Sequence, residues 1–271
     1  MDKISVIMGI YNCADTLDEA IKCILDQTYE NWELIMCDDS STDDTYSVAE
    51  KYLKEMPDKV ILLKNKKNEG LNATLNHCLR YATGQYIARM DGDDLCTNDR
   101  FEKEIRFLQE HREFDIVSSN MEYFDDCGVF ARSHMAEFPK KEDLVFGTIF
   151  CHAPCMVTKK AYDAVDGYTE DKKLLRMEDY ELWIKLYAAG YKGYNIQEPL
   201  YSMRDDRNAA KRRKYRYRIN EAYVRYLAIK RLDLSKWKLV YVFRPLIVGL
   251  LPVGLYSKIH RRKLNYIQGE K

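Results

Sequence analysis

The stretch ISVIMGIYNCADTLDEAIKCILDQ, residues 4–27, decides the fold class. Its first part, residues 4–10, is mostly apolar and rich in isoleucine and valine, which is typical of a buried strand. Residues 15–27 then place apolar side chains on one helical face: Leu17, Ile21, Ile24 and Leu25. A strand followed at once by an amphipathic helix is the unit from which parallel sheets are built.

The same alternation continues to residue 90. Strands are expected at 33–37, 60–64 and 85–90, and helices at 41–56, with Thr42 as the cap, and around 71–82. Right-handed strand–helix–strand units of this kind predict an α/β fold. We expect a Rossmann-like, mostly parallel central sheet with helices on both faces.

The composition is that of a globular protein. With 271 residues, 46% of them hydrophobic, the chain can bury a substantial core as one large domain or one domain with an appendage. The eight cysteines are scattered, and several lie in or beside apolar runs, so reduced, cytosolic thiols are expected. The N-terminal residues show neither a long apolar region nor a cleavage site, so no secretory signal is expected.

Charge is distributed unevenly along the chain. From Arg204 to the end there are 19 Lys and Arg against 5 Asp and Glu, which gives this tail a charge of +14 and residues 1–203 a charge of −14. Such asymmetry predicts that the tail meets an anionic surface, either nucleic acid or a membrane leaflet.

Acidic clusters follow two of the expected strands, as RMDGDD (89–94) and DDSSTDD (38–44), and Tyr11 and Asn12 follow another. In open α/β sheets, ligands bind at the carboxyl ends of the strands. A single Asp at such a place is usually a helix cap or a turn residue. Two clusters together would repel unless a cation lay between them, and carboxylates with substrate phosphates are the usual ligands of Mg²⁺ or Mn²⁺. A metal ion and a nucleotide diphosphate are therefore expected.

Six motifs, taken in order, resemble those of the family 2 glycosyltransferases, which have the GT-A fold. They are SVIMGIYN (5–12), DDSSTDDT (38–45), KNEGLNATLN (67–76), GQYIARMDGDD (84–94), HAPCMV (152–157) and MEDYELWIKL (177–186). The resemblance covers roughly residues 3–204. It implies a nucleotide-sugar donor, usually a UDP-sugar, a divalent metal held by a DxD motif, and inversion at the anomeric carbon by direct displacement. Many relatives build bacterial capsule, O-antigen or other surface polysaccharides.

The resemblance also implies roles for particular residues on the donor side. Asp39 matches the residue that recognises uracil, and Tyr11 matches an aromatic residue near the base. Asn68 and Gly70 match positions that bind the nucleotide-sugar. Asp93 is expected as the direct metal ligand and Asp91 as a contact to ribose or to the metal through water, with Asp94 assisting.

An inverting transfer needs a base for the acceptor hydroxyl. Glu178 and Asp179 fall in the first turn of an expected helix, where acidic residues commonly offset the helix dipole. Their match to the family's ED motif instead implies that Asp179 is the catalytic base, with Glu178 holding the acceptor or orienting the site. Arg204 matches an arginine near the diphosphate, and a solvated side chain is the alternative.

Two positions depart from the family pattern. Gly9 and Ile10 stand where relatives usually have Pro-Thr, and Asp166 stands where a glycine is common. These departures concern donor packing and leave the proposed metal ligands and base intact.

The tail, residues 205–271, is expected to form a helical extension of a catalytic domain at 1–204. Residues 208–234 are typical of a basic helix, and 239–256 are apolar but interrupted by Arg244, Pro245 and Pro252, too short and broken to span a bilayer. Basic flanks suit association with the anionic inner face of the cell membrane from the cytoplasm. The alternative is a helical pair packed on the catalytic domain or on a second subunit of a homo-oligomer.

Rival functions predict other features. A sugar nucleotidyltransferase should carry a Gly-rich, basic phosphate loop after its first strand, which GIYNCADT does not supply. Nucleic-acid binding would explain the basic tail but neither the acidic clusters nor the apolar run, so no nucleic-acid partner is expected. An inactive membrane-surface scaffold would not need Asp91, Asp93 and Asp179. The acceptor is expected to be a saccharide or a lipid-linked oligosaccharide.

Overall fold

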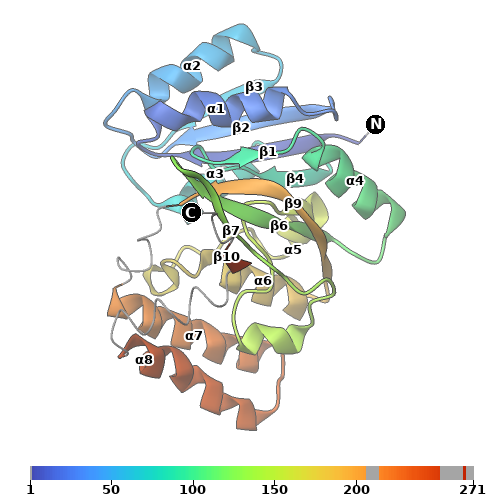
Figure 1. Ribbon diagram of the computed structural model, residues 1–271, viewed down its shortest axis with the longest axis vertical. Coiled ribbons are helices and arrows are strands. Elements are labelled where there is room, and N and C mark those ends of the chain that lie inside the picture. Colours follow the sequence, from blue (N-terminus) through green and yellow to red (C-terminus); the bar gives the residue numbers. More distant parts are fainter. Residues whose placement is uncertain (1, 206–213, 251–264, 267–271) are drawn as a thin grey trace.

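The computed structural model describes residues 2–205, 214–250 and 265–266 (Figure 1). The elements are, in order, β1 (Ile4–Ile10), α1 (Ala14–Leu25), β2 (Trp32–Asp38), α2 (Thr45–Glu55), β3 (Val60–Lys64), α3 (Leu71–Leu79), β4 (Tyr86–Arg89), β5 (Leu95–Cys96), α4 (Arg100–Glu110), β6 (Ile116–Asp125), β7 (Gly128–Arg132), the 3₁₀ helix η1 (Lys141–Val145), β8 (Met156–Thr158), α5 (Lys159–Ala164), η2 (Lys172–Leu174), α6 (Glu178–Ala188), β9 (Gly193–Arg204), α7 (Tyr215–Arg231), η4 (Lys236–Phe243), α8 (Arg244–Gly249) and β10 (Asn265–Tyr266).

One sheet forms the centre of the molecule. Its first part, in the spatial order β3, β2, β1, β4, is parallel throughout. The register aligns the carboxyl ends of these strands, so that Ile10 lies beside Asp38 and Asp38 beside Lys64. Beyond β4 the sheet becomes mixed: β8 is antiparallel to both β4 and β6, while the long strand β9 runs parallel to β6. The α/β fold and the aligned strand ends are confirmed, and antiparallel strands complete the sheet.

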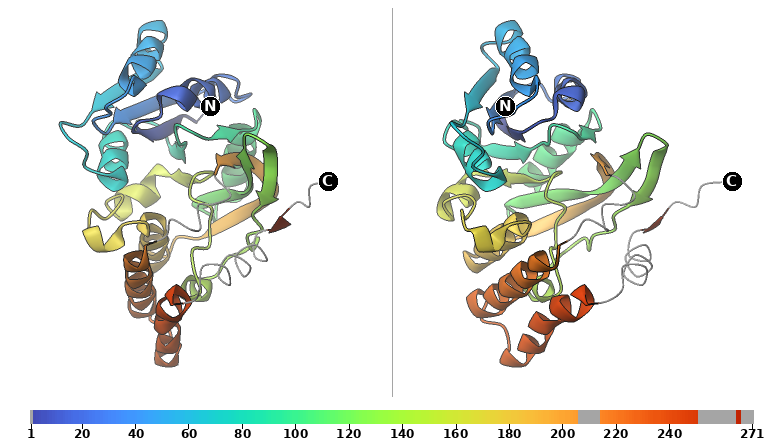
Figure 2. Two further views of the ribbon diagram at one scale, coloured as in Figure 1. Left: turned by 60° about the vertical axis from the view of Figure 1, so that its left-hand side comes forward. Right: turned by 90° about the vertical axis from the view of Figure 1, so that its left-hand side faces the viewer.

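Two hydrophobic layers cover the faces of this sheet, as the alternating strand pattern requires. On one face, Val6, Met8 and Ile10 pack with α1, α2 and α4. On the other face, Ile7 and Ile35 pack with α3, α5, α6 and α7. Figures 1 and 2 show helices on both sides of the sheet. The predicted helical face of α1 is buried at Leu17, Ile21 and Ile24.

The predicted cap at Thr42 is wrong. Helix α2 begins at Thr45 and its N-cap residue is Asp44, with no side-chain cap bond. The backbone N–H of Thr42 instead donates to Oδ1 of Asn12 at 2.9 Å. Because this bond joins the loops after β1 and β2, residues 39–44 serve as a connection at the strand ends, and the helix starts later.

Helix α7 extends the core of the catalytic fold. It contacts α6, η1 and η2, and its buried side chains include Val224, Ala228 and Ile229. After it, η4 and α8 fold back along α7 (Figure 2). None of the helices in the described part of the chain has both the length and the hydropathy needed to cross a bilayer. Residues 208–213 and 251–256 of the two predicted tail segments lie outside the described residues, and the division at residue 204 stays a prediction.

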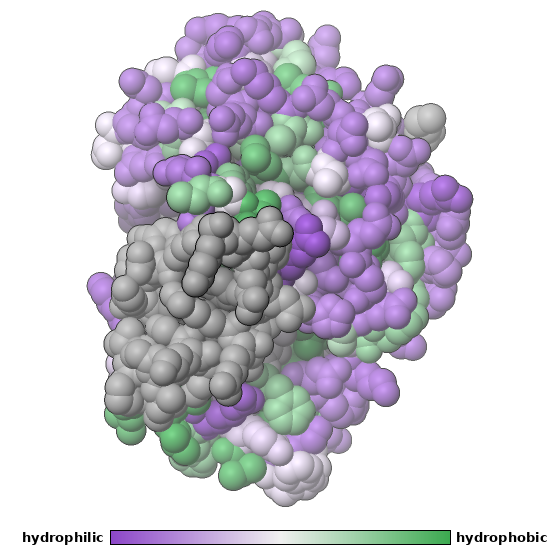
Figure 3. Space-filling model, in the orientation of Figure 1, coloured by the Kyte–Doolittle hydropathy of each residue, from purple (hydrophilic) through white to green (hydrophobic). Residues whose placement is uncertain are grey.

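Apolar side chains are exposed on this C-terminal part. Trp237, Val240, Phe243, Ile247 and Leu250 expose 63%, 61%, 59%, 63% and 75% of their surface. We call these five residues the apolar ridge. Figure 3 shows apolar residues gathered at the lower end of the molecule, where η4 and α8 lie. All eight cysteines are free thiols, as predicted.

Candidate active site

The side chain of Asp39 joins the loops at the carboxyl ends of β2 and β3. Its carboxylate accepts hydrogen bonds from Nδ2 of Asn65 at 2.8 Å and from the backbone N–H groups of Glu69 and Gly70 at 2.8 and 2.9 Å. Gly70 has a φ of +90°, which favours glycine. Asp39 therefore fixes the loop that carries Asn68 and Gly70.

Tyr11 lies at the same edge of the sheet. It follows β1, with 48% of its surface exposed, and the N–H of Asn12 beside it donates to Oγ of Ser41 at 3.1 Å. The structure thus brings Tyr11 and Asp39 to one rim, as their places after parallel strands predicted, and the loop with Asn68 and Gly70 is attached there through Asp39.

Asp91, Asp93 and Asp94, which we call the carboxylate centre, follow β4. Nη2 of the buried Arg89 donates to both oxygens of Asp91 at 2.6 and 2.8 Å. Asp94 is buried and accepts from the Tyr201 hydroxyl at 3.0 Å and from the backbone N–H of Arg204 at 2.8 Å. Strands β4 and β9, distant in the chain, therefore build the centre together.

The three carboxylates repel one another electrostatically. Burial, followed by the charges of Asp91 and Asp93, raises the pKa of Asp94 to about 8. Desolvation and then the charge of Asp91 raise the pKa of Asp93, although its side chain reaches solvent. Negative charge is thus only partly neutralised by Arg89 and Arg204, which is the condition a bound cation would relieve.

These residues fit a divalent metal held jointly with a ligand. Carboxylate oxygens suit Mg²⁺ or Mn²⁺, which are commonly bound by one or two carboxylates and substrate phosphates. Within the described residues, no three or more His, Cys, Asp or Glu side chains converge as a complete metal site. Asp91 and Asp93 would therefore supply part of the coordination.

Arg204 lies against the carboxylate centre, and its role near a diphosphate stays a prediction. Its Nε donates to the backbone carbonyl of Asp93 at 3.1 Å, and Nη2 pairs with Glu19 at 2.9 Å. The guanidinium stacks over the Phe124 ring at 4.6 Å. These contacts hold the side chain in place and leave it about one-third exposed.

Asp179 is the second residue of helix α6. Its Oδ2 accepts from the Thr148 hydroxyl at 3.3 Å. Burial, and then the negative charge of Glu178, raises the pKa of Asp179, while the positive charge of Arg89 acts in the opposite direction. Arg89 therefore hydrogen-bonds Asp91 and also lies within electrostatic reach of Asp179. The Glu178 carboxylate accepts from the Arg176 N–H at 2.8 Å.

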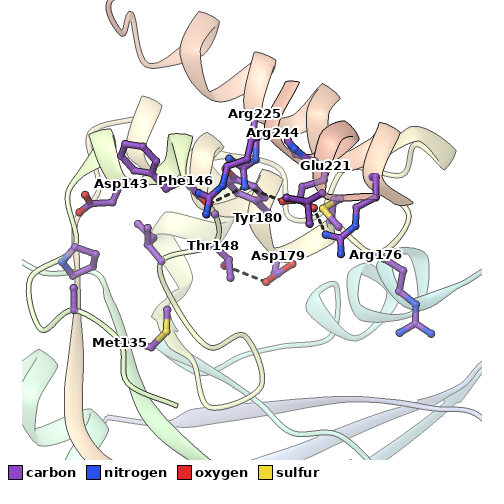
Figure 4. A pocket seen from close by; sticks show the side chains of 18 of the residues that line it. Met135, Asp143, Phe146, Thr148, Arg176, Asp179, Tyr180, Glu221, Arg225 and Arg244 are labelled. Carbon is purple, nitrogen blue, oxygen red and sulfur yellow. Dashed lines mark hydrogen bonds and ion pairs between the residues drawn. The ribbon is translucent and has the colours of Figure 1, made fainter. Parts of the chain in front are cut away.

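A cavity of about 690 Å³ adjoins Asp179, and we call it the Asp179 cavity. Its walls come from residues 134–149, from residues 176–180 at the start of α6, and from α7 and α8. Figure 4 shows Asp179 and Thr148 on one wall, with Glu221, Arg225 and Arg244 across from them. A ligand in this space would lie directly against the Asp179 carboxylate.

Several of these residues were not predicted from the sequence. Arg89 is a charged residue within the apolar strand segment QYIARM, and this contrast was the available signal. Tyr201 and Thr148 carried no such signal. The cavity arginines at 176, 218, 225 and 244 come from separate segments, and only the fold brings them together.

The backbone conformation at Asp166 shows how one departure from the family pattern is tolerated. Its φ is +54°, in the left-handed region that favours glycine. Asp tolerates this conformation better than most residues. The substitution therefore keeps the turn before Gly167.

The solved structures that this chain resembles are glycosyltransferases of the GT-A fold. One is the S. aureus TarS fragment 1–349 in complex with UDP-GlcNAc, with a TM-score of 0.69 and 18% identity, matched over 96% of this chain and 74% of that chain. At this level of identity the likeness establishes the fold.

Sequence comparison defines the family. Residues 5–165 match Glycosyl transferase family 2. The putative glycosyltransferase EpsE of Bacillus subtilis (strain 168) is 44% identical over 262 residues, 97% of this chain and 94% of EpsE. The Escherichia coli enzyme WfaP, a UDP-Glc:alpha-D-GlcNAc-diphosphoundecaprenol beta-1,3-glucosyltransferase, is 30% identical over 72% of this chain and 74% of its own. The chain belongs to glycosyl transferase family 2 and is a glycosyltransferase.

Proposed function

We propose that the protein is a metal-dependent, inverting glycosyltransferase that moves a sugar from a UDP-sugar to a saccharide or lipid-linked saccharide in cell-surface polysaccharide synthesis. One observation carries this proposal: Arg89 hydrogen-bonds Asp91 of the carboxylate centre and also lies within electrostatic reach of Asp179, so a candidate leaving-group site and a candidate base lie near the same guanidinium. The names of WfaP and of the TarS complex support a UDP-sugar donor.

On the donor side, Tyr11 and Asp39 would contact the base, with Asn68 and Gly70 on the loop that Asp39 holds. Asp93, with Asp91, would hold Mn²⁺ or Mg²⁺ against the diphosphate. When bound, such an ion supplies Lewis-acid stabilisation of the departing UDP. Arg204 adds a fixed positive charge beside Asp93.

On the acceptor side, Asp179 accepts the proton of the attacking hydroxyl. Burial raises its pKa, which makes the carboxylate a stronger base than an exposed aspartate. The Thr148 hydroxyl and the backbone N–H of Tyr180 donate to this carboxylate and fix its orientation. Direct attack from this side inverts the anomeric centre.

The apolar ridge supports association with an anionic membrane surface on the cytoplasmic face. Its exposed side chains alternate with Lys236, Lys238 and Arg244, the pattern of a segment that lies in a membrane interface. The alternative partner is a second copy of this chain. Sedimentation of the protein with and without phosphatidylglycerol vesicles distinguishes the two, because a dimer forms without lipid.

The proposed function is tested with a panel of nucleotide-sugars. We expect one UDP-sugar to raise the melting temperature only with Mn²⁺ or Mg²⁺, and transfer to stop with a chelator. Asp93→Asn should abolish this metal-dependent shift, whereas Asp58→Asn, on an exposed turn, should leave it intact. Metal-independent binding of every nucleotide-sugar, or release of pyrophosphate from UTP and a sugar phosphate, would instead favour the nucleotidyltransferase alternative.

A further inference from the structure

The two oxygens of the Asp39 carboxylate have different surroundings. Oδ1 accepts from Nδ2 of Asn65 and from the backbone N–H of Glu69, both at 2.8 Å. Within the described residues, Oδ2 accepts only from the backbone N–H of Gly70, at 2.9 Å. An ionised carboxylate has about four acceptor positions. Oδ1 is therefore fully occupied, and Oδ2 keeps one position for a further donor.

The side chain of Asn65 is buried and has a fixed orientation. Its Nδ2 faces the Asp39 carboxylate and the Thr74 hydroxyl, at 2.8 and 3.0 Å. The amide oxygen then faces the other way, 2.9 Å from Nδ1 of His77 and 3.5 Å from Sγ of Cys37. Because the amide oxygen only accepts, Nδ1 of His77 carries the hydrogen of their bond. Both ends of the amide are engaged, so it cannot turn over without losing bonds on each side.

Helix α3 completes this network. Thr74 and His77 lie three residues apart on α3, and therefore on one face of it. The Thr74 hydroxyl donates to the carbonyl of Gly70 at 2.9 Å, while the N–H of Gly70 donates to Asp39. Asn65 directly follows β3 and lies between the helix and Asp39. Asp39 is thus set in place by groups from α3 and from the end of β3 before any ligand binds.

The orientation of Asp39 matters for the base of the donor. Under the proposed function, on which this inference rests, Asp39 contacts uracil. N3 of uracil carries a hydrogen and donates, whereas N3 of cytosine accepts. An oxygen with a free acceptor position therefore binds the first base and repels the second. This discrimination requires that Oδ2, and not the occupied Oδ1, faces the base.

We propose that Asn65 is a specificity-determining positioning residue, which holds Oδ1 of Asp39 so that Oδ2 is presented to the nucleobase and selects uracil over cytosine. His77 supports this role by fixing the Asn65 amide. Neither side chain needs to touch the nucleotide, because both act through Asp39. Without the Asn65 amide, the carboxylate would keep only backbone donors and would be freer to turn away from the base.

Calorimetry with UDP and with CDP, each in the presence of Mn²⁺, tests this. The two ligands share ribose and diphosphate, so the ratio of their dissociation constants reports recognition of the base. We expect the wild type to prefer UDP by roughly tenfold or more, as one hydrogen bond to a charged group would give. Asn65→Leu, of similar volume, should reduce this preference at least threefold. The control Asn98→Leu, on an exposed turn, should keep the wild-type ratio.

Two substitutions at His77 keep the test valid if Asn65→Leu does not fold. His77→Asn places an amide N–H where Nδ1 of the ring lies and should retain the preference for UDP. His77→Phe keeps a ring near Tyr81 but has no donor, so the preference should fall. His77 is only half-buried, and urea unfolding should confirm that both variants fold.

The possible outcomes separate this inference from the proposed function. An equal weakening of UDP and CDP in Asn65→Leu and His77→Phe would mean that the network only supports the loop, and would overturn the inference. An unchanged ratio in both variants would overturn it as well, as would equal affinities for UDP and CDP in the wild type. If the wild type bound neither ligand, the proposed function itself would be wrong.

Discussion

The carboxylate centre and the Asp179 cavity are constructed differently. In the carboxylate centre, Asp91 and Asp94 are held by Arg89, Tyr201 and the Arg204 backbone, all from strands or their ends. The cavity is walled by helices and loops that come later in the chain. One region is a fixed polar network, and the other is an open space with arginines on its walls.

This difference fits the ligands proposed for each side. A nucleotide diphosphate is the same in every turnover, so preorganised strand ends suit it. An acceptor varies between enzymes, and the surface loops that wall the cavity can change without disturbing the sheet. The comparison predicts that substitutions in the two regions affect different measurements.

The largest effect is expected from Asp179→Asn. Without the base, transfer should fall by about 10³-fold, within the range for general-base catalysis. UDP binding with Mn²⁺, measured by calorimetry, should be unchanged because the carboxylate centre is intact. Equal losses of transfer and of UDP binding would mean that Asp179 supports the fold of both regions.

The same variant has a predictable effect on stability. Burial and Glu178 raise the pKa of Asp179, so the unfolded chain releases this proton at lower pH than the folded chain does. Folding stability from this group therefore falls as pH rises through that interval. At neutral pH, Asp179→Asn should be at least as stable as the wild type in urea unfolding, which separates lost chemistry from lost folding.

Arg89→Met is expected to destabilise the carboxylate centre and to remove a positive charge that acts on Asp179. It leaves Asp91 without its cation in a largely buried position, and removal of one partner of a buried pair costs roughly 3 kcal/mol. Because Asp91 is partly exposed, we use the lower end of the range of roughly 3–5 kcal/mol for breaking a buried ion pair. Urea unfolding measures the loss, and Arg106→Met, at an exposed pair on α4, is the control with little expected change. Wild-type stability in Arg89→Met would show that the Asp91 pair contributes little.

The first 90 residues show how much of the fold was predictable. The strand and helix ranges there agree with the structure to within a few residues because each element has its own apolar periodicity. Aligned strand ends then placed Asp39 and Asp91 at one edge. The start of α2 was wrong because Thr42 bonds to Asn12, a contact between loops that periodicity does not encode.

The rest of the site depends on long-range packing. Strand β9 pairs with β6 through register shifts near Asn120, and this brings Tyr201 and Arg204 to Asp94. The Asp179 cavity likewise needs α7 to pack on α6. No local sequence pattern predicts either contact. The roles implied for Asp179 and Arg204 came from motif resemblance, and their placement is consistent with those roles.

Substitutions on the apolar ridge should affect only the binding of the protein to membranes. Phe243→Ser and Ile247→Ser should each weaken binding to phosphatidylglycerol vesicles roughly tenfold, from about 1.4 kcal/mol of lost apolar burial. Both side chains are more than half exposed, so unfolding free energy should change little. Tyr81→Ser, exposed at the end of α3, is the matched control. Unchanged vesicle sedimentation in both variants would reject the ridge as a membrane contact.

The smallest effect concerns Glu178. Its charge is the second cause of the raised pKa of Asp179, after burial. Glu178→Gln removes that charge but keeps an oxygen for the Arg176 N–H, so the loop should stay in place. Since transfer needs ionised Asp179, kcat/KM falls as pH drops through the pKa of the base.

The variant should therefore move the acidic limb of the kcat/KM profile to lower pH by a fraction of a unit, whereas Glu142→Gln on η1 should not. A shift in the opposite direction would mean that the limb reports a group other than Asp179. Because burial is the larger cause, most of the elevation should survive in Glu178→Gln, and the limb should remain above the pH expected for an exposed aspartate.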